Sequence, residues 1–218
     1  MSQKGYMMAK RLSKTDNMKK AIFKFGQMTF DQGKYFLPPY TRSGCDPVSA
    51  TAEEAEKIMK ALSAERVVRI KGDVGYPFIT TKRTPCIFDQ KTIDSIWILL
   101  HYAYTHGEEK QPWELVDDVI VESSGCVRLR YILNHRIIVN IIPIDSPSDI
   151  DQMIIEDKQY VADEYGKEDV RYLVITRNKK WLIAAGNAKV NFPIKYVLIT
   201  GDETHEPTEI KYLKKANK

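Results

Sequence analysis

The sequence predicts an α+β protein in two parts, divided near residue 85. In the first part, apolar residues recur at intervals of three and four, which is typical of helices. In the second part, short runs rich in Val, Ile and Tyr alternate with longer helical patterns. A chain of 218 residues is long enough for two small domains. We therefore expect a mostly helical domain at 17–85 and a mixed α+β sheet domain at 86–218.

The chain begins with a polar, lysine-rich segment. Residues 1–16 have no apolar periodicity, and we interpret them as a flexible basic arm. Met18, Ile22, Phe25 and Met28 then fall on one face of a predicted first helix.

Two further helices are expected before the sheet. Thr29 is a suitable cap for a short second helix, which Pro38 would end. Thr51 precedes Glu54 by three residues, the spacing of a capping box, and so predicts the start of a third helix. The apolar face of that helix comprises Ala55, Ile58, Met59 and Leu62.

The stretch "VVRIKGDVGYPFITTKR", residues 67–83, contains a G-x-x-G pattern at Gly72 and Gly75. A P-loop is excluded because no Lys-Ser/Thr pair follows the second glycine. The glycines of a KH domain lie between helices, whereas strand-forming residues flank these. Asp73 and Val74 follow Lys71-Gly72 where an RNA-recognition motif would place a stacking aromatic residue. The pattern therefore predicts a β-hairpin.

The second part begins with a helix at about 89–106 and continues with strands near 116–122, 127–133 and 136–142. A second helix follows from about residue 146 to 165. We then expect four short strands, formed by "VRYLVITR", "KWLIAAG", "KYVLIT" and "EIKYLK", with a turn at Asn178-Lys179. Basic residues interleave with four aromatic residues on the expected strands, namely Tyr131, Tyr172, Trp181 and Tyr196. Alternation between a core face and a solvated face explains that pattern more simply than a single-strand binding surface.

Charge is distributed unevenly between the two parts. Residues 1–85 contain 16 Lys and Arg against 8 Asp and Glu, whereas residues 86–218 contain 17 against 21. A basic first part beside an acidic second part suggests that the first part meets a polyanion. A solvated basic arm would give part of the same asymmetry.

Three helices followed by a hairpin resemble a winged helix-turn-helix domain over residues 17–85, and "MTFDQGKYFLP" resembles its second helix. The resemblance implies double-stranded DNA as a partner, with the third helix in the major groove and the hairpin, or wing, on phosphates. The candidate DNA-binding residues are Arg42, Lys57, Lys60, Arg66, Arg69, Lys71, Lys82 and Arg83.

The third helix also carries a feature that opposes DNA binding. Glu53, Glu54 and Glu56 occupy its first turns, where carboxylates would repel phosphates. They also suit a helix N-terminus for structural reasons. The alternative is a protein-interaction or inhibitor protein whose winged helix binds a protein partner.

The whole arrangement is similar to uncharacterised bacterial proteins of conjugative elements, plasmids and phages, in the manner of replication–relaxation proteins. The segments that carry this resemblance are "DSIWILLHYA", "VRLRYILNHRIIVNIIPI" and "VRYLVITRNKKWLIAA". The resemblance implies a role in maintaining a mobile element. It implies no reaction.

The second part also resembles a restriction-endonuclease-like core. Such nucleases hold Mg²⁺ with an Asp and with an acidic residue two positions before a Lys on a strand. The one such triplet, Glu156-Asp157-Lys158, falls on a predicted helix, and Asp145, Asp149 and Asp151 suit the start of that helix. We therefore expect a catalytically empty version of the core, no enzyme activity and no cofactor, with a metal-dependent nuclease as a further alternative.

The cysteines and the lengths of the apolar runs bear on the cellular location of the protein. Cys45, Cys86 and Cys126 are widely separated and form no metal motif, which suggests reduced thiols and no metal site. No secretory signal is recognisable, and no apolar run reaches the length of a membrane span. We expect a cytoplasmic protein without a membrane partner; the pattern does not predict an oligomeric state.

Overall fold

The computed structural model describes residues 13–37, 51–72, 78–81, 89–105, 116–121, 127–133, 137–162, 170–203 and 205–213. Over these residues the protein contains six α-helices, one 3₁₀ helix and two β-sheets. This architecture confirms the predicted α+β class.

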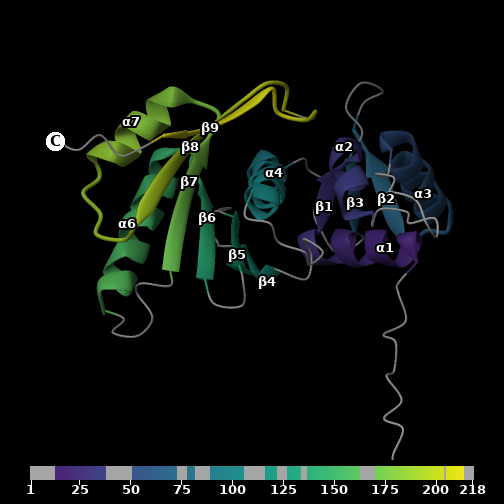
Figure 1. Cartoon of the computed structure of the whole chain (residues 1–218), viewed down its shortest axis with the longest axis horizontal. Helices are drawn as coiled ribbons and strands as arrows, with labels where there is room; N and C mark the ends of the chain where they lie inside the picture. The colour runs from purple at the N-terminus through teal and green to yellow at the C-terminus, as the bar shows by residue number, and fades with distance from the viewer. Residues whose placement is uncertain are drawn as a thin grey trace, which may run out of the picture.

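The first part forms an N-terminal module of helices around a small sheet. Its elements are α1 (Lys14–Phe25), β1 (Gln27–Thr29), α2 (Phe30–Gly33), the 3₁₀ helix η1 (Lys34–Phe36), α3 (Ala52–Ala64), β2 (Val68–Lys71) and β3 (Phe78–Thr81). The strands pair antiparallel in the order β1-β3-β2. The module lies at one end of the molecule, with α3 on the side away from the large sheet (Figure 1).

Side-chain caps start the helices of this module. Thr29 and Gln32 form a complete capping box at α2, and the Thr51 hydroxyl accepts a hydrogen bond from the N–H of Glu54 at α3. Both caps satisfy N–H groups that have no partner within the helix. The predicted caps at Thr29 and Thr51 are confirmed.

The first helix differs from the expectation at both ends. It begins at Lys14 because the Ser13 hydroxyl caps it, so the last residues assigned to the arm are helical. It ends at Phe25 because Gly26, with φ of 81°, takes a backbone conformation that few other residues adopt. Met28 is therefore buried in β1 and is not part of the helix.

The second part is built on a six-stranded mixed sheet. Its elements are α4 (Gln90–Thr105), β4 (Val116–Val121), β5 (Val127–Leu133), β6 (Ile137–Pro143), α6 (Pro147–Ala162), β7 (Val170–Thr176), α7 (Lys179–Asn187), β8 (Ile194–Thr200) and β9 (Glu209–Leu213). The strands follow chain order across the sheet. β6, β7 and β8 run parallel, and the other neighbouring pairs are antiparallel.

The segment "KWLIAAG" is the helix α7, so its prediction as a strand is wrong. Parallel strands such as β7 and β8 cannot be joined by a hairpin, and α7 supplies the crossover between them. Leu182 and Ala185, three positions apart, are both buried. Asn178 caps this helix and does not form the predicted hairpin turn.

The large sheet is covered on both faces (Figure 1). Residues of α6 and α7 share one hydrophobic cluster with Tyr172 and Tyr196 of the sheet, which confirms the core interpretation of these two tyrosines. On the other face, α4 lies between the sheet and the N-terminal module, and one continuous cluster contains residues of all three. No described helix is long and apolar enough to cross a membrane.

Polar contacts reinforce the packing of the module on α4. The Gln32 side chain donates to the carbonyl of Ile93 over 2.7 Å, and both residues are buried. The ring of Tyr35 meets Trp97 edge to face, with centroids 5.8 Å apart. The module is thus held in a defined position against α4.

Candidate functional site

Five of the eight predicted DNA-binding residues fall within the described ranges, and all five are exposed: Lys57, Lys60, Arg66, Arg69 and Lys71. They belong to α3, to β2 and to the short link between these elements. The other three, Arg42, Lys82 and Arg83, lie outside the described residues.

The outward face of α3 has one stripe of exposed residues. These residues are Glu53, Lys57, Lys60 and Ala64, at spacings of four, three and four. The opposite face buries Ala55, Met59 and Leu62. The stripe therefore faces solvent along the length of the helix.

Two of the three glutamates at the start of α3 are paired with lysines. Glu54 Oε1 lies 2.6 Å from Lys14 Nζ, and Glu56 Oε1 lies 2.6 Å from Lys60 Nζ. Each pair offsets one negative charge on this surface. The repulsion of phosphates expected from the sequence is accordingly smaller, with Glu53 the most exposed of the three carboxylates.

Arg66 ends α3 in a strained conformation. Its φ is 60°, and it is the one non-glycine residue with positive φ in the described part of the chain. The N–H of Arg66 donates to Ser63 O, and the N–H of Val67 donates to Leu62 O, each over 3.0 Å. These bonds form the Schellman motif, in which glycine is the usual residue at the position of Arg66. A bulky cation there has an energetic cost of its own.

Arg69 and Lys71 occupy alternate positions on β2, an edge strand of the small sheet. Both side chains are exposed, whereas Val68, the first residue of β2, is buried. Gly72 follows with φ of 91°, the glycine conformation expected for a hairpin. We call the exposed faces of α3 and β2, with Arg66 between them, the α3–β2 surface.

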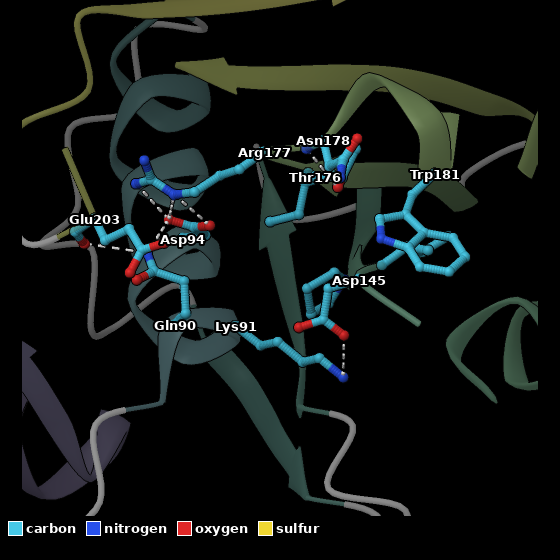
Figure 2. A pocket seen from close by; sticks show the side chains of 12 residues that line it. Gln90, Lys91, Asp94, Asp145, Thr176, Arg177, Asn178, Trp181 and Glu203 are labelled. Atoms are coloured by element: carbon cyan, nitrogen blue, oxygen red, sulfur yellow. Dashed lines mark hydrogen bonds and ion pairs between the residues drawn. The ribbon is translucent and has the colours of Figure 1, made fainter. Parts of the chain in front are cut away.

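A separate pocket lies in the second part, beyond the carboxyl ends of β6 and β7 (Figure 2). Its volume is about 330 Å³. The first turn of α4, the starts of the α6 and α7 segments and the loop after β8 line it, through residues that include Gln90, Lys91, Asp94, Asp145, Arg177, Trp181 and Glu203. Carboxyl ends of parallel strands are where open α/β sheets bind ligands.

Lys91, in the first turn of α4, lies between the carboxylates of Asp145 and Asp149. Its ammonium is 2.7 Å from Asp149 Oδ1 and 3.1 Å from Asp145 Oδ1. Burial would raise the pKa of Asp149, but hydrogen bonds from Lys91, from the N–H of Asp145 and from Ser146 outweigh it and hold the pKa below 3.8. For Asp145, burial and the neighbouring Asp149 carboxylate raise the pKa.

Arg177 joins α4 to the loop between β8 and β9. Its Nε and Nη2 donate to Asp94 at distances of 2.8–2.9 Å, and Nη1 donates to the carbonyls of Gly201 and Asp202. Burial raises the pKa of Asp94 against the opposing effect of Arg177. A bidentate, largely buried pair of this kind positions the loop beside the pocket.

The same loop also contacts the N-terminal module. Glu206 accepts hydrogen bonds from Lys34 and Tyr35, each over 2.6 Å. The N–H of Glu206 donates to Asp31. One short loop thus connects the pocket wall with α2 and η1.

The described residues contain no group of three or more His, Cys, Asp and Glu side chains suited to a metal ion. The triplet Glu156-Asp157-Lys158 lies in α6, as predicted. Asp157 accepts hydrogen bonds from the N–H groups of Asn191 and Phe192 and from the Asn191 side chain. Its observed role is to anchor the chain after α7. The three cysteines lie outside the described residues.

The chain matches no protein-family model, no curated protein and no solved structure. The geometry of the α3–β2 surface and of the pocket is therefore the basis for any functional assignment.

No local motif of the sequence indicates the pocket. The residues that line the pocket come from segments up to 113 positions apart in the sequence, which is the separation of Gln90 and Glu203. Recognition of "KWLIAAG" as a crossover helix would have indicated parallel strands, whose carboxyl ends carry Asp145 and Arg177.

Proposed function

We propose that the protein is a non-enzymatic, DNA-binding regulatory protein and that its N-terminal module is a winged helix. The order α1-β1-α2-α3-β2-β3, with the strands arranged β1-β3-β2, supports this proposal. In such a domain α3 is the element that enters the major groove, and β2 with β3 is the wing.

The observation that carries the proposal is the α3–β2 surface. Lys57, Arg66, Arg69 and Lys71 are exposed on adjoining elements, so both the helix and the wing present cations to solvent. Contacts between such cations and phosphates position a protein on duplex DNA. The strained Arg66 supports a role for its guanidinium, since glycine would fit its backbone better.

We also propose that a plasmid, phage or conjugative element encodes the protein, because its sequence segments resemble those of mobile-element proteins. A cytoplasmic location is proposed because Cys45, Cys86 and Cys126 are widely separated and form no metal motif, as is typical of reduced thiols. For the second part we propose a restriction-endonuclease-like core without nuclease activity. The order α4-β4-β5-β6-α6-β7, in which three antiparallel strands precede a parallel one, supports that core. The position of Glu156-Asp157-Lys158 on a helix supports the lack of cleavage.

A gel shift of the full chain with duplex DNA at low and moderate salt tests the proposal. We expect binding at low salt that weakens as salt rises, because phosphate contacts release counterions. Absence of binding at low salt would reject it, and a stable pull-down complex with a protein would then favour the interaction alternative. Cleavage of the DNA on addition of Mg²⁺ or Mn²⁺ would reject the non-enzymatic assignment.

A further inference from the structure

The pocket beyond β6 and β7 has the dimensions of a small-molecule site. Its volume of about 330 Å³ lies within the range of roughly 300–1,000 Å³ that is typical of ligand pockets. Figure 2 shows Trp181 on one side of it and α4 on the other, with Asp145 between them. None of the residues proposed for DNA binding lines it.

The charges of the pocket favour a cation over an anion. Three lining carboxylates, on Asp94, Asp145 and Glu203, face two lining cations, Lys91 and Arg177. Both cations already have carboxylate partners. Arg177 uses four of its five N–H groups on Asp94 and on two loop carbonyls. An anionic ligand would therefore compete with the carboxylates that Lys91 and Arg177 already bind.

Gln90 belongs to the α4 wall of the pocket. The Gln90 side-chain nitrogen donates to Asp94 and to the carbonyl of Glu203, which fixes the orientation of its amide. Its Oε1 atom is buried and accepts no hydrogen bond from the described residues. Buried acceptors normally have a donor partner, and the described residues supply none for this oxygen.

Trp181 adds a surface on which a cation is stabilised. The ammonium of Lys180 already lies 4.8 Å from the centroid of the indole ring. Tryptophan attracts cations more strongly than other aromatic side chains do, through the negative charge of its ring faces. Carboxylates beside an indole form a combination suited to an ammonium or guanidinium group.

We propose that this pocket binds a small organic cation through its ammonium or guanidinium group. Glu203 and Asp145, which shares the Lys91 ammonium with Asp149, would receive the charged N–H groups, and Trp181 would pack against the cation. This inference goes beyond DNA binding, does not depend on it, and assigns the second part a ligand of its own.

Isothermal titration of the full-length protein with agmatine tests the proposal, since agmatine carries both a guanidinium and an ammonium group. We expect saturable binding at a single site that Asp145→Asn weakens about tenfold, as expected for loss of a charge-assisted hydrogen bond. Asp151→Asn, at an exposed position of α6 outside the pocket, is the matched control and should bind as the wild type does.

Glu203→Gln keeps the test decisive if Asp145→Asn does not fold, because Glu203 lies in an exposed loop. This variant should also weaken agmatine binding. The proposal is overturned if agmatine does not bind, if both pocket variants bind it as the wild type does, or if inorganic phosphate binds the pocket in its place. Failure to bind DNA would leave each of these outcomes unaffected.

Discussion

The phenol of Tyr35 donates a hydrogen bond to Glu206 Oε1 over 2.6 Å and so joins η1 to the loop between β8 and β9. The other carboxylate oxygen of Glu206 accepts from Lys34, also over 2.6 Å. The residues concerned are separated by 171 and 172 positions in the sequence. These contacts, with the apolar packing on α4, hold the N-terminal module in place.

Replacement of Glu206 by Gln tests this link. The pair is partly exposed, so solvent screens it, and we expect a loss of about 1 kcal/mol or less in the free energy of unfolding. Hydrogen exchange should become faster in α2 and η1 and remain unchanged in β7. Urea denaturation and exchange mass spectrometry measure the two effects, with Glu209→Gln on exposed β9 as control. Unchanged exchange in α2 and η1 would show that Glu206 does not hold the module.

The same contact should depend on pH. Burial would raise the pKa of Glu206, but hydrogen bonds from Lys34 and Tyr35 outweigh it and hold the pKa below 4.5. A carboxyl group with a depressed pKa in the folded state stabilises the protein above its ordinary pKa, and this effect disappears as pH falls through the folded value. The difference in stability between wild type and Glu206→Gln should thus be constant from pH 7 to about 5.5 and shrink below about 4. A difference that grows on acidification would contradict this.

Asp94 and Arg177 form the more enclosed ion pair, and its disruption should have a larger effect. Their side chains are 7% and 16% exposed. Removal of one partner leaves an uncompensated charge in a largely buried site, which costs about 3–5 kcal/mol. We expect Asp94→Ala to approach that loss in a denaturation experiment. The double variant Asp94→Ala with Arg177→Met should recover part of it, and a double variant that is less stable than Asp94→Ala would argue against this account.

Arg66 offers a substitution that should separate stability from binding. Arg66→Gly removes the strain of a positive φ, so we expect thermal or urea unfolding to show a gain of about 0.5–1 kcal/mol. The same variant should bind DNA more weakly because it removes a cation. Arg66→Ala, which keeps the strain and removes the charge, is the control for stability. A fall in stability on Arg66→Gly would show that the guanidinium makes a stabilising contact that outweighs the strain.

The first half of the chain was the more predictable from sequence. Thr29 and Thr51 are caps whose effect is local, and Met59 and Leu62 follow the period of a helix. "KWLIAAG" was misassigned because a short apolar run fits a strand as well as a helix, and the parallel pairing of β7 and β8 decides between them. The pocket does not follow from any local motif, because Lys91, Asp145 and Arg177 meet only through the parallel order of the strands, which the assignment of "KWLIAAG" as a strand conceals.

Cations of the α3–β2 surface are proposed to contact the phosphates of duplex DNA. Arg69→Glu combined with Lys71→Glu reverses two exposed charges on β2. Lys158→Glu combined with Lys189→Glu changes net charge equally at exposed positions of the second part. The two double variants therefore separate a local contact from an effect of total charge.

Fluorescence anisotropy of a labelled duplex across a series of salt concentrations is the most direct measurement. We expect the wild type and the Lys158/Lys189 variant to have the same salt slope. We expect the Arg69/Lys71 variant to bind more weakly, with a slope smaller by about 2. Equal affinity and equal slope for the Arg69/Lys71 variant and the wild type would contradict the claim.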